Sequence, residues 1–401
     1  MKADQKKALP GFSLILLAFI AFIALGMPDG LLGVAWPTIR HDFNIPLDSL
    51  GWLLAMATAG YIISSFTSGQ LIARLGVGRL LSISCLLTAS ALVGYTLVPQ
   101  WWMMVLLGIA AGLGAGAIDA GLNTYVAAHF SERTMQWLHA SYGIGVTTGP
   151  FIMTFALSTL NSWRAGYRIV GGFQFILGLC FISTISLWAR YKSSSKQEDK
   201  RITEYKTPII DTLKQPGVWL SMALFFLYVG SEISLGAWAY TLLTESRGIA
   251  TQTAGFFAGS YWGTFTIGRI LAGLILKKIN SKTLVIYAIS GALSGALLLW
   301  WNPANWTNLA AVALIGFSIA PIFPALTSST NQRVEDKHTA NTIGMQMAAS
   351  GLSGAIIPGL VGVLARLISL EIIPVCLAFL FAALLALFLI ANKRRILSQH
   401  S

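Results

Sequence analysis

The apolar residues of this 401-residue chain gather into about twelve long blocks, and nearly all charged residues lie between them. A helix needs about 20 mostly apolar residues to cross a bilayer. Charged residues are 10% of the chain, against about 25% in soluble domains, too few to cover a water-facing surface. We therefore predict an all-α membrane protein with twelve transmembrane helices, near residues 11–38, 50–73, 79–98, 102–128, 135–158, 168–190, 217–243, 252–276, 283–301, 307–330, 339–365 and 371–392. Ten spans with two re-entrant segments are the alternative.

The loop charges predict the orientation, because cytoplasmic loops of membrane proteins carry an excess of Lys and Arg. With both termini inside, cytoplasmic segments hold 21 of the 27 Lys and Arg, and external loops hold Arg40, Arg164, Arg168, Arg247 and Arg366. This distribution explains the net charge of +12 without nucleic acid as a partner. We expect a monomeric multi-pass protein of a bacterial inner membrane, with cytoplasmic N- and C-termini and the lipid bilayer around it.

One long polar segment, residues 191–215, interrupts the apolar blocks. It predicts a cytoplasmic linker between an N-terminal six-helix bundle, 1–190, and a C-terminal six-helix bundle, 216–401. Two motifs occur once in each half at offsets of 204 and 208 residues: Gly69-x-Leu-x-x-Arg74-x-Gly76 with Gly273-x-Ile-x-x-Lys278-x-Asn280, and Gly143 to Pro150 with Gly351 to Pro358. The repeats predict two pseudo-symmetric bundles, an arrangement found in secondary transporters with a substrate site near the midplane.

Several function classes find no support in the sequence. The chain has no Gly-x4-Gly-Lys-Ser/Thr phosphate-binding loop, no HExxH and no Gly-x-Ser-x-Gly, so ATP hydrolysis and hydrolase chemistry are unsupported. Its three cysteines contain no CxxC pair, which argues against a zinc module. We expect no enzyme activity, no cofactor and no metal.

The motif from Gly69 to Gly76 resembles the cytoplasmic loop motif of the major facilitator superfamily, although Ala73 stands where many members carry an acid. The resemblance implies a gating role for Arg74 and Gly76. Within the superfamily, the chain is most similar to the fucose permease branch and related glucose transporters. This rests on Asp29 beside a Gly-Met-Pro break, the run from Gly112 to Asn123, Leu138-His139, and the prolines Pro321 and Pro324. The fucose permease has Glu where Asp119 stands.

Four clearly charged side chains lie inside the predicted spans: Asp29, Asp119, Glu232 and Arg269. An ionised group at mid-bilayer costs roughly 2.5–3.5 kcal/mol on insertion scales, so these groups must face water, pair, or be neutralised. Asp119 lies near the middle of span four, with Asn123 on the same face at i+4. We assign Asp119 to proton coupling, which the resemblance also implies, and Asn123 to substrate binding. A buried acid bonded to a neighbouring helix is the alternative.

Asp29 follows Pro28 in span one, and Trp36 lies two turns further along the same face. Asp29 is a candidate for proton coupling or for binding sugar hydroxyls, with Trp36 as a stacking surface; the alternative is an acid that reaches the headgroups. Glu232 lies 203 residues after Asp29 in the equivalent span, and Tyr228, one turn before it, is a candidate for substrate binding. Glu232 is a second titrating site, a substrate ligand, or the partner of Arg269. We expect Arg269 to extend toward the cytoplasm and to act in gating.

His139 lies about one turn inside span five. We place it with the substrate-binding residues; histidine also suits proton relay, and a bond to a backbone carbonyl is the alternative. Three further aromatic residues could stack on sugar rings or form the interfacial belt: Trp238, Tyr261 and Trp262.

The combined pattern predicts a secondary active transporter of a small polar solute, with proton symport of a sugar as the specific hypothesis. Sodium stays possible as the coupling ion, because carboxylates and carbonyls serve either ion. The alternatives are a proton-coupled exporter of amphipathic compounds and a lipid flippase on the same fold. A transport-dead sensor is disfavoured, because the linker and tail leave no room for a signalling domain.

Overall fold

The computed structural model describes residues 9–46, 49–190, 202–203, 205–275 and 279–398. Residues 191–201 and 204 of the predicted linker lie outside these ranges, and so does Lys278. The N-terminal half contains α1 (Leu9–Phe43), α2 (Leu50–Leu75), α3 (Val77–Tyr95), α4 (Trp101–His129), α5 (Glu132–Thr159) and α6 (Trp163–Arg190). The C-terminal half contains α7 (Ile209–Leu213), α8 (Pro216–Thr241) with a π-helical turn (Leu242–Ser246), α9 (Thr251–Ile275), α10 (Ser281–Trp301), α11 (Asn305–Ile319), α12 (Ile322–Ser328), α13 (Asp336–Leu367) and α14 (Ile372–Ser398).

Ten helical segments of the described chain are long and apolar enough to cross a membrane. Helices α5 and α9, of 28 and 25 residues, are long enough to cross a bilayer core of about 30 Å, although they are not among these ten. The prediction of an all-α membrane protein is confirmed. Several helices extend beyond the apolar blocks, since polar residues at the membrane surface continue a helix: α1 starts at Leu9 and ends at Phe43, and α6 starts at Trp163.

Contacts divide the chain into two compact units. The first unit comprises residues 1–130, 138–209 and 336–348, and the second comprises 131–137, 210–335 and 349–401. Helices α5 and α13 are each divided between the units. The start of α5, up to residue 137, belongs to the second unit and its remainder to the first, whereas α13 belongs to the first unit up to residue 348 and to the second beyond it. The assignment of two domains at 1–190 and 216–401 stays a prediction.

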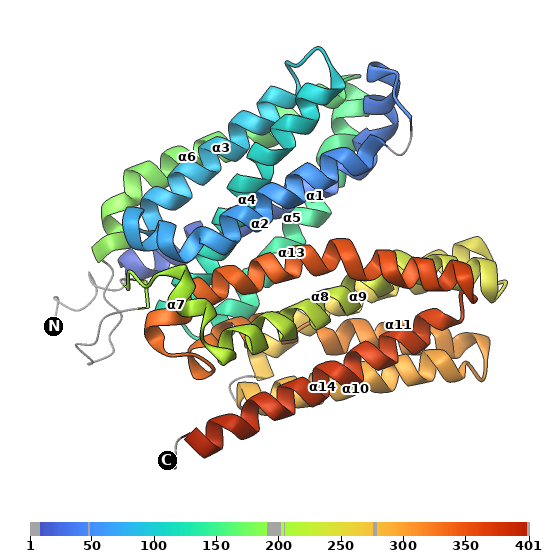
Figure 1. The fold of residues 1–401 in the computed structure, drawn as a ribbon. Helices are drawn as coiled ribbons and strands as arrows, with labels where there is room; N and C mark the ends of the chain where they lie inside the picture. The colour runs from blue at the N-terminus through green and yellow to red at the C-terminus, as the bar shows by residue number, and fades with distance from the viewer. Residues whose placement is uncertain (1–8, 47–48, 191–201, 204, 276–278, 399–401) are drawn as a thin grey trace. The chain divides into compact units, whose positions relative to one another are not determined.

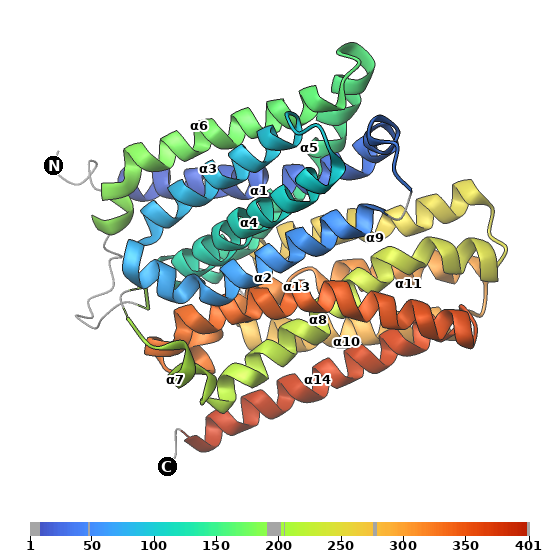
Figure 2. The ribbon, with the colours of Figure 1, turned by 45° about the horizontal axis from the view of Figure 1, so that its top comes forward.

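In the first unit, α2 packs against α4 and α3 against α6, as Figures 1 and 2 show. The contact between α2 and α4 depends on the buried glycines Gly108, Gly112 and Gly116, which the sequence places one turn apart. A Cβ built on Gly112 would overlap the carbonyl oxygen of Ala57, and one on Gly116 would overlap that of Tyr61. Small residues at this spacing let helix backbones approach closely in membranes.

In the second unit, span ten is one crossing made of two helices. Helix α11 ends at Ile319 and α12 begins at Ile322, because Pro321 has no backbone N–H to continue the helical hydrogen bonds. The side-chain amide of Gln136 donates to the carbonyl oxygen of Pro321 at 3.0 Å, which adds a partner at the break. The predicted span over 307–330 corresponds to this crossing, Asn305–Ser328.

Each unit contains an ion pair that joins its first and last spans. In the first unit, Arg164 at the start of α6 donates to Asp42 at the end of α1 (2.6 Å). In the second, Arg247, which follows α8, pairs with Glu371, which precedes α14 (2.7 Å). The acid precedes the arginine in the first half of the sequence and follows it in the second. The two pairs support a duplicated fold in which an ion pair joins the first and last spans of each unit at one end.

The pair of Arg247 and Glu371 predicts a pH-dependent stability. Hydrogen bonds from Arg247 hold the pKa of Glu371 below its ordinary value, so the folded state favours the charged carboxylate. Its stabilisation is present above the ordinary glutamate pKa and is lost as the pH falls through the lowered one. We expect Glu371→Gln to lower the free energy of unfolding by about 1 kcal/mol near pH 7, since the Glu371 side chain is 43% exposed.

The measurement is thermal unfolding of the purified protein between pH 7 and pH 3. The difference between wild type and Glu371→Gln should narrow as the pH drops below about 4, near the ordinary glutamate pKa. Asp211→Asn is the matched control, because its ion pair with Lys214 is exposed on both sides, and we expect no effect from it. A difference that stays constant down to pH 3 would contradict the role of the ion pair.

Candidate functional site

The candidate site of the first unit is a chain of polar side chains on α1, α2, α4 and α5. The glycines of α4 bring Tyr61 of α2 against Asp119. Four other glycines bring α1 and α5 together: Gly26, Gly30, Gly145 and Gly149. The Cβ of an alanine at Gly149 would lie 3.0 Å from the Cα of Gly30. Close backbone contact therefore sets the positions of the polar groups on all four helices.

Both carboxyl oxygens of Asp119 accept hydrogen bonds. The hydroxyl of Tyr61 donates to Oδ2. The side-chain amide of Asn123 donates to Oδ1 at 2.8 Å and to the backbone carbonyl of Asp119 at 3.0 Å. Asp119 is half-buried, whereas Asn123 is fully buried. The predicted i+4 pair on one face of α4 therefore forms a direct contact.

Asn123 continues this chain to His139 of α5. With its amide nitrogen directed at Asp119, the carbonyl Oδ1 of Asn123 faces Nε2 of His139 at 3.0 Å. An amide oxygen only accepts hydrogen bonds, so Nε2 of His139 carries the hydrogen in this arrangement. The ring of Phe22 meets the imidazole edge-to-face, with centroids 5.4 Å apart. His139 thus orients Asn123, and Asn123 orients Asp119.

Asp29 joins the site through Tyr142. The hydroxyl of Tyr142 on α5 donates to Oδ2 of Asp29 at 2.5 Å. Asp29 is exposed, and because an acid within a span avoids lipid, it must face water. The carboxyl groups of Asp29 and Asp119 lie close enough to interact electrostatically. Four predicted residues, Asp29, Asp119, Asn123 and His139, therefore belong to one polar site.

The second unit holds a separate cluster around Glu232. The hydroxyl of Tyr261 donates to the backbone carbonyl of Glu232 at 2.9 Å, and Tyr228 is fully buried one turn before Glu232. Arg269 lies over the ring of Phe265 at 4.1 Å and interacts electrostatically with Glu232. The cluster therefore combines an acid, a cation and two phenols within the second unit.

The expected direction of Arg269 is wrong. The side chain is 7% exposed and points back along α9 toward Phe265, one turn nearer the helix N-terminus. Helical side chains lean toward the N-terminal turn, and here an aromatic face and the charge of Glu232 meet the guanidinium. Arg269 therefore belongs to the cluster of Glu232 rather than to the cytoplasmic surface.

The predicted stacking aromatics occupy different places. Trp36 is 6% exposed and packs against Trp101, with centroids 5.5 Å apart, in the apolar core of the first unit. The indole N–H of Trp238 donates to the carbonyl of Pro358 at 2.9 Å, so this side chain joins α8 to α13. Trp262 is 45% exposed and packs edge-to-face on Tyr261. Of these side chains, Trp262 has the most accessible ring.

Two of the three residues assigned to gating, Arg74 and Gly76, lie at the turn between α2 and α3. Gly76 ends α2 with φ at 77°, and its N–H bonds to the carbonyl of Ile72 at 2.8 Å. Only glycine adopts this conformation without strain. Arg74 is exposed in the last turn of α2. The geometry explains why a glycine stands at position 76.

Sequence reasoning missed Tyr61 and Tyr142, although each hydroxyl binds a predicted acid. Tyr142 lies three residues after His139, on the same helix face, so the spacing could have identified it. For Tyr61 the signal was weaker, because it is one of several polar side chains in its span. Its role depends on the packing of α2 against α4, which the sequence of α2 alone does not specify.

Comparisons with known proteins identify the family. The model of the Major Facilitator Superfamily matches residues 14–358 and 221–396. The glucose/mannose transporter GlcP of Bacillus subtilis is 22% identical over 356 residues, 86% of this chain and 86% of the relative. The sodium-dependent glucose transporter 1 of Homo sapiens is 24% identical over 395 residues, 86% and 72% of the two chains. A crystal structure of the E. coli fucose:proton symporter FucP has the same fold, with a TM-score of 0.74 at 14% identity, over 94% of this chain and 98% of that chain. Since the family model spans most of its residues, the chain belongs to the Major Facilitator Superfamily.

Proposed function

We propose that this protein is a secondary active transporter that moves a sugar by alternating access together with a proton. The observation that carries the proposal is the carboxyl group of Asp119, inside a membrane span, with both oxygens held by Tyr61 and Asn123. The sugar is supported by relatives named as glucose and glucose/mannose transporters. The proton is supported by the fold neighbour named as a fucose:proton symporter. We place the protein as a monomer in the bacterial inner membrane with cytoplasmic termini.

The hydrogen bonds of Asp119 suggest how a proton would promote sugar binding. The amide nitrogen of Asn123 can only donate, so Oδ1 must remain an acceptor. A proton therefore binds at Oδ2, and the hydroxyl of Tyr61 must then turn to accept from Asp119. The hydrogen of Tyr61 is released to donate to a sugar hydroxyl. Protonation of Asp119 thus creates a donor for the substrate, and loss of the proton withdraws it.

The other residues of the site take supporting roles in this proposal. His139 and Asn123 orient Asp119. Asp29, which is exposed and bound by Tyr142, is the second acid of the proton pathway and a ligand for sugar hydroxyls. In the second unit, Glu232 with Arg269, Tyr228 and Tyr261 forms a second charged cluster for coupling or binding, and Trp238 and Trp262 offer aromatic surfaces.

Tyr61→Phe tests this mechanism. In the wild type, affinity for the transported sugar should rise as the pH falls, because protonation of Asp119 frees the Tyr61 hydrogen. Without the Tyr61 hydroxyl, the increase in sugar affinity at low pH should be lost. We expect that increase to be about fivefold, the effect of one hydrogen bond. The measurement is equilibrium binding of glucose, mannose and fucose to purified protein from pH 5 to pH 8.

Tyr95→Phe is the matched control in the same unit, because Tyr95 is a buried tyrosine that packs on Tyr167. It should keep the pH dependence of the wild type. If Tyr61→Phe also keeps that dependence at full strength, Tyr61 does not link protonation to sugar binding.

A further inference from the structure

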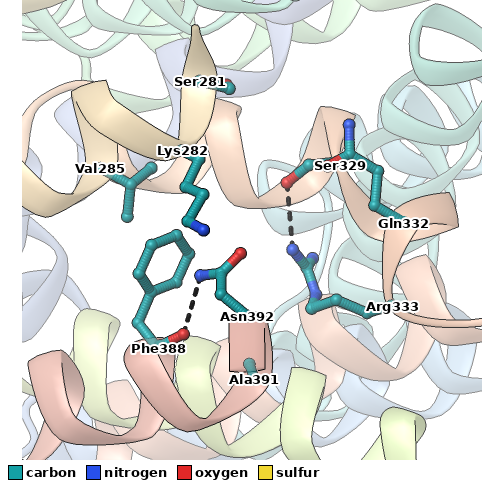
Figure 3. Close-up of a pocket in the computed structure, with 9 residues that line it drawn as sticks. All are labelled: Ser281, Lys282, Val285, Ser329, Gln332, Arg333, Phe388, Ala391 and Asn392. Atoms are coloured by element: carbon teal, nitrogen blue, oxygen red, sulfur yellow. Dashed lines mark hydrogen bonds between the residues drawn. The ribbon is translucent and has the colours of Figure 1, made fainter. Parts of the chain in front are cut away.

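The second unit contains a pocket that is separate from the polar site around Asp119 and from the cluster around Glu232. It contains about 400 Å³ of space, part of which is open to solvent. The pocket lies between the start of α10, the turn that follows α12, and the C-terminal half of α14 (Figure 3). Its described lining is Ser281, Lys282, Val285, Ser329, Gln332, Arg333, Phe388, Ala391 and Asn392. These nine residues include two cations and no carboxylate.

Arg333 is a half-buried cation whose described hydrogen bonds all go to neutral groups. Its guanidinium donates to the hydroxyls of Ser221 and Ser329, each at 3.0 Å, and to that of Thr330 at 3.3 Å. It also donates to the carbonyl of Leu326. Burial lowers its pKa to about 10, so the group stays charged at neutral pH. The described ion pairs do not include Arg333, and its charge therefore has no anionic partner among them.

Lys282 supplies the second positive charge from the first turn of α10. It is exposed, and Figure 3 shows its amine pointing into the space beside Phe388 and Asn392, with Arg333 on the opposite wall. The first turn of a helix also carries a partial positive charge. An acid near this turn is Glu132, whose pKa is raised by burial; it is not part of the pocket lining. With Lys282 and Arg333 in its walls, the pocket is a positively charged site for an anion.

The walls combine this charge with apolar surface. Val285 and Phe388 lie one turn deeper on α10 and α14 than Lys282 and Asn392. The predicted orientation places this end of the helices at the cytoplasmic leaflet, which is rich in anionic lipids. A lipid headgroup would meet the two cations while its acyl chain runs along the apolar side chains.

We propose that this pocket binds a phosphate group between Lys282 and Arg333, presented by an anionic phospholipid of the cytoplasmic leaflet. The ligand chemistry is a phosphate ester with net negative charge. Free inorganic phosphate offers the same chemistry without the acyl chain. The site is separate from the transport mechanism, since its lining includes no residue of the Asp119 chain or the Glu232 cluster.

The test is native mass spectrometry of the full-length protein with added phosphatidylglycerol, phosphatidylcholine or inorganic phosphate. We expect wild type to retain one phosphatidylglycerol in preference to phosphatidylcholine. Lys282→Ala should weaken this binding about fivefold, the effect of one basic residue at an anionic surface, and Lys282→Arg should restore it. Lys214→Ala is the control, because Lys214 is an exposed lysine of the same unit paired with Asp211.

The variants are at Lys282 because Arg333 supports the end of α12 and its removal could prevent folding. If inorganic phosphate binds but phosphatidylglycerol does not, and Lys282→Ala abolishes the phosphate binding, the phosphate site is supported and its ligand is a soluble phosphate rather than a lipid. Binding of phosphatidylglycerol without binding of phosphate would support the lipid. Equal binding of phosphatidylglycerol to wild type and Lys282→Ala, or no binding of either anion, would overturn the proposal.

Discussion

Asp119→Asn should abolish sugar accumulation driven by a pH gradient while leaving sugar exchange across the membrane intact. A pH difference of about one unit stores about 1.36 kcal/mol per proton, enough for about tenfold accumulation at one proton per sugar. A carboxamide does not titrate, so the accumulation ratio should fall from about ten to one. The measurement is uptake into proteoliposomes with an inside-alkaline gradient, compared with exchange of labelled for unlabelled sugar.

The substitution should preserve the local structure. The oxygen of the introduced carboxamide would still accept from Asn123, and its nitrogen would donate to Tyr61, whose hydroxyl can accept. Asp211→Asn, at an exposed acid outside the spans, is the control and should accumulate sugar normally. Full gradient-driven accumulation by Asp119→Asn would show that the coupled proton binds elsewhere, with Asp29 and Glu232 as the next candidates.

Gly112→Val should strongly destabilise the first unit. Even a Cβ at this position overlaps the backbone carbonyl of Ala57, and a backbone atom of a packed helix cannot move aside as a side chain can. We expect the free energy of unfolding to fall by at least about 3 kcal/mol, the upper end of the usual cost of overpacking. Since proteins are stable by only about 5–15 kcal/mol, this loss is a large share of the total stability, and the yield of folded protein and the unfolding temperature should both fall. Size-exclusion chromatography and thermal unfolding measure both effects.

Gly172→Val provides the comparison, because a Cβ at Gly172 of α6 has no atom within 4 Å. It should fold with near wild-type stability. Equal stability of the two variants would mean that the approach of α2 to α4 does not depend on Gly112, and that Tyr61 reaches Asp119 by other means.

Much of the fold and most of the polar site around Asp119 follow from local sequence patterns. Apolar block length predicts the spans, and the i+4 spacing of Asp119 and Asn123 places them on one face of α4. The cost of burying charge singles out Asp29, Glu232 and Arg269. These inferences succeed because they depend on one helix and its surroundings, not on which helices pack together.

The parts that the sequence did not predict depend on packing between helices. Tyr61 becomes a ligand of Asp119 only because α2 contacts the glycine face of α4. The repeats do not predict the ion pairs of Arg164 and Arg247, because the acid precedes the arginine in the first half of the sequence and follows it in the second. Trp36 matched the face of Asp29 by spacing, yet it packs against Trp101 in the core.

Proton-coupled sugar transport is tested by uptake of labelled glucose, mannose and fucose into proteoliposomes with an inside-alkaline pH gradient. We predict that at least one sugar accumulates above equilibrium and that a protonophore abolishes this accumulation. Accumulation that needs a sodium gradient instead would contradict proton coupling. No accumulation of any sugar under either gradient would contradict the sugar assignment and direct the search to exported amphiphiles and lipids.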